Sequence, residues 1–141
     1  MQRKANAVWK GGLKDGNGTL TAPSGVLNNT KYSFRTRFEN EPGTNPEELI
    51  AAAHAGCFSM ALSAQLGERG MKPEEIATEA NLTMENLTIT AIHLTVRARI
   101  PGADPTKFQE AAEAAKAGCP VSKVLNAKIT MDAKLESGSA A

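Results

Sequence analysis

The sequence has few aromatic residues, only two cysteines and no excess of charge of either sign. Aromatic residues make up 4% of the 141 residues, so the core must be built largely from aliphatic side chains. Sixteen basic residues against 15 acidic ones give a net charge of +1. No overall field attracts nucleic acid or an anionic membrane, and we expect neither as a partner. The length predicts a single domain.

The start of the sequence lacks the apolar segment that directs secretion. Polar and basic residues follow Met1, and no apolar run precedes Trp9. We therefore expect a cytoplasmic protein. In a reducing compartment, a pair of cysteines is more often catalytic, redox-active or simply reduced than joined in a structural disulfide.

One long segment, Leu49 to Leu66, contains no formally charged residue over eighteen positions. It is rich in alanine but carries His54 and other polar residues, which a lone membrane span would expose to lipid. The segment therefore predicts a central core helix, apolar on all sides. The sequence from Asn45 to Glu48 supplies an N-cap, a proline, acids and a capping-box glutamate, and we expect the helix to stop near Gly67 or Gly70.

Alternating apolar and polar residues predict strands with one solvated face. The alternation has no error over residues 92–100 and 127–135, and it recurs over 80–84 and 5–9. Turn residues between positions 11 and 18 indicate that the chain begins as a β-meander.

Two further helices have clear starts, at Asp104-Pro105 and at Cys119-Pro120. The first should end at Gly118 and present one apolar face, formed by Phe108, Ala111, Ala112 and Ala115. The expected fold is α+β, with antiparallel strands, one deeply buried helix and two short helices packed outside. We expect the domain to cover residues 1–136 and residues 137–141 to form a flexible tail.

Cys57 falls in the middle of the predicted central helix, and Cys119 falls at a helix N-terminus, where the backbone N–H groups favour a thiolate. Cys57 can equally be an inert core residue, since free cysteine is among the most buried residue types. His54 lies three residues before Cys57, which leaves a Cys-His hydrolase open, although no oxyanion hole is evident. His93 lies on a polar strand face and should be solvated. The cysteines and histidines match no standard zinc pattern.

Four segments with specific motifs resemble one protein family in order and spacing. They are Phe34–Phe38, Gly43–Ile50, Ala53–Leu62 and Ala115–Ser122. The sequence resembles the OsmC/Ohr family of osmotically induced proteins and organic hydroperoxide resistance proteins over about residues 4 to 136. The combination of Thr36-Arg37-Phe38 with His54 is similar to the OsmC branch.

The resemblance implies a thiol-dependent peroxidase that acts on organic hydroperoxides, and less well on hydrogen peroxide, in oxidative and osmotic stress defence. It implies antiparallel sheets wrapped around a central buried helix, in an intertwined homodimer with active sites at the interface. Cys57 would be the peroxidatic and Cys119 the resolving cysteine, joined in a disulfide during the cycle. Arg37 would activate the Cys57 thiolate, and Glu47 would orient Arg37.

No cofactor or metal is implied by the resemblance, only an external dithiol reductant, for which the Ohr branch suggests a lipoyl protein. The alternative is a non-catalytic stress-induced binding or structural protein with inert buried thiols. The physical chemistry of thiols agrees with the roles that the resemblance implies. Burial raises the pKa of a thiol, a fixed guanidinium favours its thiolate, and a second thiol traps the sulfenic acid.

Helix geometry predicts that the active site is shared between two chains. Glu47 and Cys57 are ten residues apart on one predicted helix, which is about 15 Å along its axis and on different faces. If Arg37 and Glu47 activate Cys57, the simplest source is a partner subunit. We expect the substrate pocket to be apolar, because the neighbours of Cys57 in its motif are Ala53, Phe58, Met60 and Ala61.

Overall fold

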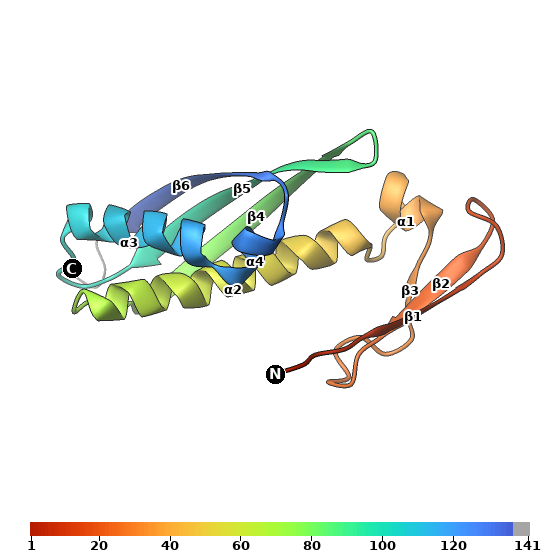
Figure 1. Ribbon diagram of the computed structural model, residues 1–141, viewed down its shortest axis with the longest axis horizontal. Helices are drawn as coiled ribbons and strands as arrows, with labels where there is room; N and C mark the ends of the chain where they lie inside the picture. Colours follow the sequence, from red (N-terminus) through yellow and green to blue (C-terminus); the bar gives the residue numbers. More distant parts are fainter. Residues whose placement is uncertain (137–141) are drawn as a thin grey trace. The chain divides into compact units, whose positions relative to one another are not determined.

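A computed structural model describes residues 1–136 of the chain (Figure 1). The chain divides into two compact units, one from Met1 to Leu49 and one that begins at Ile50. The single domain expected over residues 1–136 stays a prediction. The flexible tail expected at residues 137–141 lies outside the described residues.

The N-terminal unit contains a three-stranded antiparallel meander, which confirms the predicted β-meander. Its strands occur in the order β1 (Asn6–Lys10), β2 (Asn17–Thr21) and β3 (Thr30–Tyr32). Gly18 in β2 is buried and lies opposite both Trp9 and Tyr32. The two rings meet with their centroids 5.5 Å apart. A Cβ at Gly18 would come within 2.7 Å of either ring, so only glycine lets both aromatic side chains cross this strand.

A short helix, α1 (Phe34–Phe38), follows β3 and was not predicted. Ser33 caps it, with its Oγ accepting from the Thr36 N–H at 3.3 Å while the Thr36 hydroxyl accepts from the Ser33 N–H at 2.9 Å. This reciprocal capping box needs only a hydroxyl residue at both ends of the S-x-x-T spacing. The local signal was therefore in the sequence, and it places Arg37 in the last turn of the helix.

Helix α2 (Pro46–Glu68) begins at the predicted cap. The Asn45 Oδ1 accepts from the Glu48 N–H at 2.8 Å, and the Asn45 Nδ2 donates to the Thr36 carbonyl at 2.9 Å. Glu48 does not close a capping box; its carboxylate accepts from the Thr44 hydroxyl at 2.9 Å instead. Asn45 thus joins α1 to the first turn of α2.

The end of α2 agrees with its predicted position. The last helical residue is Glu68, and Gly70 follows in a left-handed conformation with φ of 76°. The Met71 N–H then donates to the Leu66 carbonyl at 2.9 Å. This is the backbone pattern by which a glycine terminates a helix.

The C-terminal unit contains a second sheet, in which one prediction is wrong. Its strands are β4 (Glu75–Glu85), β5 (Thr88–Arg99) and β6 (Lys128–Glu136), with β5 in the centre. β4 and β5 are antiparallel as predicted, but β6 runs parallel to β5. The reason is the long connection over residues 100–127, which contains α3 (Pro105–Gly118) and α4 (Pro120–Val124) and returns the chain to the starting end of β5.

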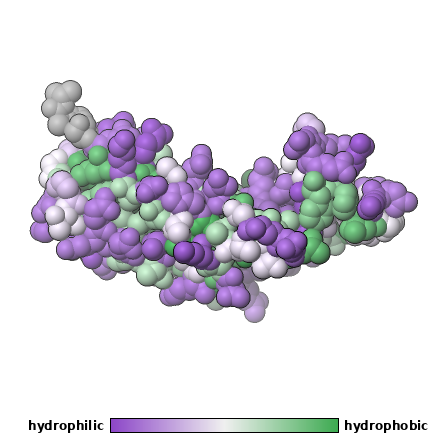
Figure 2. All heavy atoms as spheres, turned by 90° about the horizontal axis from the view of Figure 1, so that it is seen from above, coloured by the Kyte–Doolittle hydropathy of each residue, from purple (hydrophilic) through white to green (hydrophobic). Residues whose placement is uncertain are grey.

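The core of this unit lies between one face of the sheet and the helices (Figure 1). The alternation predicted for β5 is confirmed, because Ile92, Leu94, Val96, Ala98 and Ile100 are all buried. The face predicted for α3 is confirmed as well, with Phe108, Ala111, Ala112 and Ala115 buried. Figure 2 shows hydrophilic residues over most of the face in view, with hydrophobic residues exposed between them.

In the single chain, helix α2 is buried along one stripe only, so its expected burial on all sides, completed by a partner's sheet, stays a prediction. The stripe consists of His54, Phe58, Leu62 and Leu66, at a spacing of one helical turn. The opposite side is exposed in the single chain, with Met60 77% exposed. Among the described helices, α2 alone is long and apolar enough to cross a membrane, a criterion that the core helix of a soluble protein also meets.

Candidate active site

The two cysteines lie in contact, although 62 positions separate them in the sequence. Cys57 is half-buried on α2, and Cys119 is buried at the N-cap of α4, the position predicted for it. The Cys119 Sγ donates to the Cys57 Sγ at a distance of 2.7 Å, and both thiols are free. A disulfide at about 2.05 Å would need a further approach of less than 1 Å.

The surroundings of Cys57 favour its neutral form. The pKa of this thiol is raised, chiefly because burial disfavours the thiolate, and the contact with Cys119 raises it further. The backbone N–H of Val121, in the first turn of α4, acts in the opposite direction by donating to the sulfur. Helix α4 thus presents both a second thiol and a hydrogen-bond donor to Cys57. A positive charge close to the sulfur would favour the thiolate.

Arg37 and Glu47 form a bidentate ion pair in the N-terminal unit. The Arg37 Nε lies 2.9 Å from the Glu47 Oε1, and the Arg37 Nη2 lies 3.0 Å from Oε2. The hydrogen bonds that Arg37 donates to Glu47 raise the pKa of Arg37 above its ordinary value, so the guanidinium is permanently charged. It lies over the Phe38 ring, 5.0 Å from the centroid. Within residues 1–136 no partner is found for Nη1, which leaves one arm of the fork for a further group.

An aromatic pocket of about 260 Å³ lies beside Arg37 in the same unit. Its lining consists of Trp9, Leu13, Tyr32, Ser33, Phe34, Arg37 and Phe38. The apolar pocket expected around the Cys57 motif stays a prediction; in the single chain Phe58 is fully buried in the core and Met60 is exposed. The aromatic pocket was not predicted. The pattern that could have indicated it is the clustering of aromatic residues in the Phe34–Phe38 segment, together with Trp9.

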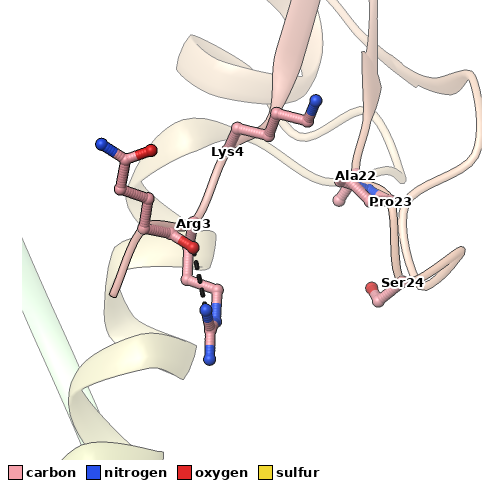
Figure 3. A pocket seen from close by; sticks show the side chains of 6 residues that line it. Arg3, Lys4, Ala22, Pro23 and Ser24 are labelled. Carbon is pink, nitrogen blue, oxygen red and sulfur yellow. Dashed lines mark hydrogen bonds between the residues drawn. The ribbon is translucent and has the colours of Figure 1, made fainter.

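A larger pocket of about 770 Å³ lies elsewhere in the N-terminal unit, between residues 2–4 and 22–24. Its side chains do not converge on a common point (Figure 3). The Arg3 guanidinium donates to the Gln2 carbonyl at 2.8 Å, and Lys4 points away from it. The residues lining this pocket include no thiol, imidazole or carboxylate. It therefore offers no group for thiol redox chemistry.

The two histidines both have defined partners. His54 is fully buried on α2, and its Nε2 lies 2.7 Å from the Ser122 Oγ on α4. Its Nδ1 has no partner among the described residues, and burial lowers the pKa of the imidazole. His93, expected to be solvated, contacts Thr130 at 2.6 Å and Asp132 at 3.1 Å because β6 lies beside β5. Within residues 1–136 no group of three side chains able to hold a metal ion occurs.

Comparison with known proteins gives the family of the chain. Residues 38–134 match the family model of OsmC-like proteins. The chain is 50% identical over 141 residues to Peroxiredoxin OsmC of Escherichia coli, covering 97% of this chain and 99% of that protein. The chain belongs to the OsmC-like family. The predicted resemblance is confirmed, and so is the prediction of a peroxidase.

The Ohr branch is also similar to this OsmC-like chain. Organic hydroperoxide resistance protein OhrB of Bacillus subtilis is 33% identical over 121 residues, covering 84% of this chain and 88% of that protein. The crystal structure of OhrB matches with a TM-score of 0.64 at 28% identity, covering 94% and 98% of the two chains. An OsmC-like protein from Mycoplasma pneumoniae shares the fold, with a TM-score of 0.75 at 14% identity over 96% and 97% of the chains.

Proposed function

We propose that this chain reduces organic hydroperoxides to alcohols, and hydrogen peroxide less well, in oxidative and osmotic stress defence. The observation that carries the proposal is the 2.7 Å contact between the Cys57 and Cys119 sulfurs in a chain of a peroxidase family. Its relatives are consistent with a soluble protein, and we place it in the cytoplasm. The helix α2 then belongs to the protein core and not to a membrane.

The reaction needs two thiols and no other redox group. The Cys57 thiolate attacks the terminal peroxide oxygen, the O–O bond breaks, and the alkoxide leaves as an alcohol after taking a proton. Cys57 is left as a sulfenic acid. The Cys119 thiolate attacks that sulfur, the S–S bond forms, and the hydroxyl leaves as water. An external dithiol, for which we propose a lipoyl protein, then reduces the disulfide and restores both thiols.

Arg37 is the proposed source of the positive charge that Cys57 needs. Its charge is permanent, two of its nitrogens are held by Glu47, and Nη1 has no partner within residues 1–136. A guanidinium fixed in this way stabilises a thiolate without the entropy cost of ordering a mobile side chain. Glu47 orients Arg37, and its carboxylate also lies at the positive end of α2.

We propose a homodimer in which the partner subunit supplies Arg37 and Glu47 to each Cys57. Helix α2 contains both Glu47 and Cys57, and ten residues of α-helix rise about 15 Å. The exposed side of α2 is suited to packing against a second copy of the chain, because it is uncharged and made mainly of small residues. Its exposed members between positions 50 and 66 are Ala52, Ala53, Gly56, Met60, Ser63 and Ala64.

The aromatic pocket beside Arg37 is the proposed site for the organic part of the hydroperoxide. A peroxide group directed at the guanidinium would leave its apolar substituent next to Trp9, Leu13 and Phe38, which line the pocket. Each buried CH₂ contributes about 0.8 kcal/mol to binding. Hydrogen peroxide has no such substituent, which accounts for the proposed preference.

The two cysteines should have unequal roles. In stopped-flow measurements with cumene hydroperoxide, Cys57→Ser should consume no peroxide, because the attacking sulfur is missing. Cys119→Ser should complete one rapid turnover and then accumulate sulfenic or over-oxidised Cys57, detected by mass spectrometry. Equal loss of the first turnover in both variants contradicts the assignment. A wild-type protein that consumes no peroxide would instead favour the alternative with inert thiols.

Removal of the Arg37 charge should shift the pH dependence of the first turnover. Without the cation the pKa of Cys57 rises, so less thiolate is present at a given pH and the rate profile moves to higher pH. We expect Arg37→Met to lower the rate at neutral pH roughly tenfold or more, with partial recovery in alkaline buffer. Arg35→Met, on the same short helix but 65% exposed, is the matched control and should leave the profile unchanged. An unshifted profile in Arg37→Met excludes this role.

The aromatic pocket should affect organic substrates selectively. Leu13→Ser removes apolar lining from the pocket, which costs about 1–2 kcal/mol of contact with the substrate. We expect kcat/KM for cumene hydroperoxide to fall about tenfold, while that for hydrogen peroxide stays constant. Val26→Ser, an exposed change in the same unit outside the pocket, should affect neither. Equal losses for both peroxides would show that Leu13 does not contact the substrate.

Subunits with complementary defects should restore activity when they are combined. Cys57→Ser chains, which should be inactive, and Arg37→Ala chains, which should have low activity at neutral pH, are unfolded together, refolded and separated by tags to isolate the heterodimer. In the shared-site arrangement, one of its two sites pairs an intact Cys57 with an intact Arg37, so up to half of wild-type activity should return. No activity in verified heterodimers, or a stable active monomer, rejects the shared site.

A further inference from the structure

We infer that the hydrogen bond between His54 and Ser122 is a positioning device for the disulfide step, because it holds the helix of Cys119 against the helix of Cys57. The inference deepens the proposed function and rests on it for its biological purpose. The arrangement itself is a property of the C-terminal unit, where α2 and α4 meet at two points. One is the Cys57 sulfur, which contacts the Cys119 Sγ and accepts from the Val121 N–H, and the other is the contact of the His54 Nε2 with the Ser122 Oγ at 2.7 Å.

The two contacts are related by helix geometry. His54 lies three residues before Cys57 on α2, so the two side chains are neighbours on the same side of that helix. Ser122 lies three residues after Cys119, about one turn into α4. The two contacts therefore connect the same pair of helices about one turn apart. A single contact would allow α4 to pivot about the sulfurs, whereas two contacts fix its direction.

Helix α4 has few other means of holding its position. It has five residues, the side chain of its N-cap accepts no hydrogen bond from the first turn, and none of its residues is fully buried. Val124 is 78% exposed, while Val121 is only partly buried against the core. A helix this short is not stable alone, so its placement depends on tertiary contacts. The hydrogen bond between His54 and Ser122 is a directional contact of this kind.

Packing alone does not explain why a histidine is buried at position 54. Its side chain is fully buried on the core stripe of α2, beside Phe58 and Leu62. Its Nδ1 has no partner among the described residues, and an unpaired buried polar atom destabilises the fold. An aliphatic residue would fill the stripe without that cost. Within residues 1–136 the one polar contact of the imidazole is with Ser122, so a role for this contact accounts for a histidine at this position.

The hydrogen bond should affect the step in which the two sulfurs form a disulfide. After peroxide has oxidised Cys57, Cys119 must approach its sulfur by less than 1 Å to form a disulfide. A fixed α4 keeps the effective concentration of Cys119 high, and a loosened α4 lowers it. The first attack on peroxide depends chiefly on Cys57 and its activation. Loss of the bond should therefore slow disulfide formation more than peroxide consumption.

The test measures the equilibrium of the purified protein with a glutathione redox buffer, without peroxide. The fraction of Cys57–Cys119 disulfide is quantified by alkylation and mass spectrometry. We expect Ser122→Ala to lower the effective concentration of the thiol pair about tenfold, which is a rise of about 30 mV in reduction potential. Ser122→Thr keeps a hydroxyl and should keep the effective concentration of the thiol pair close to that of the wild type. His54→Gln, which keeps a side-chain amide near the Nε2 position, should lie between them and serves as the second variant.

A matched control separates positioning from a general loss of stability. The Ser59 and Thr78 hydroxyls form a hydrogen bond of 2.8 Å that joins α2 to β4 and not to α4. Thr78→Val removes that bond while keeping the shape of the side chain. Its unfolding midpoint in urea should fall about as much as that of Ser122→Ala, with the thiol equilibrium unchanged. If Ser122→Ala changes the equilibrium less than twofold, or no more than Thr78→Val does, the inference is wrong.

A second readout distinguishes failure of this inference from failure of the proposed function. Stopped-flow mixing with cumene hydroperoxide gives the rate of the first turnover, and quenched samples give the rate of disulfide formation. In Ser122→Ala the first should change little, while the second should fall about tenfold and over-oxidised Cys57 should increase. If the wild-type protein consumes no peroxide, the proposed function fails and the glutathione equilibrium still tests the bond. Normal peroxide consumption with equal disulfide rates in Ser122→Ala and wild type rejects the inference alone.

Discussion

The burial of one stripe of α2 is the constraint on which the site depends. His54, Phe58, Leu62 and Leu66 recur every fourth residue, and they fix which side of the helix faces the sheet and α3. Burial of each large apolar side chain contributes about 1.5–3 kcal/mol, so rotation of the helix by one position would lose several such contributions. Cys57 precedes Phe58 and therefore lies at the edge of the stripe. There it is half-buried and within reach of α4.

This position has opposing consequences for the chemistry of the thiol. Partial burial brings the sulfur to Cys119 and keeps bulk water away, but it also raises the pKa of Cys57. Each unit of pKa corresponds to about 1.4 kcal/mol against the thiolate. The Val121 N–H offsets part of this, and the proposed role of Arg37 is to offset the rest. The same burial that allows a disulfide to form thus makes a fixed cation necessary.

The features that the sequence predicted are those with a local cause. The start of α2 follows from Asn45 and Pro46, the core face of β5 from strict alternation, and the place of Cys119 from the proline after it. Alternation gives the faces of a strand but not its direction, which is why the parallel pairing of β6 was missed. The contact between His54 and Ser122 joins residues 68 positions apart, and no local pattern encodes it. The Ser33 capping box is also a local pattern, and it would have predicted the start of α1.

The exposed side of α2 is the feature that most directly supports the proposed homodimer. A protein that acts alone gains solubility from charge on an exposed helix face, yet this face carries none between Leu49 and Leu66. In the proposed homodimer, two α2 helices pack antiparallel about a two-fold axis. For Glu47 of one chain to lie level with Cys57 of the other, that axis must pass near the midpoint of the two positions, at residue 52. Ala52 is exposed and small, and Gly56 is exposed one turn further on, so a second helix can approach closely there. The axis that the proposed pairing of Glu47 with Cys57 requires therefore falls where α2 exposes small residues.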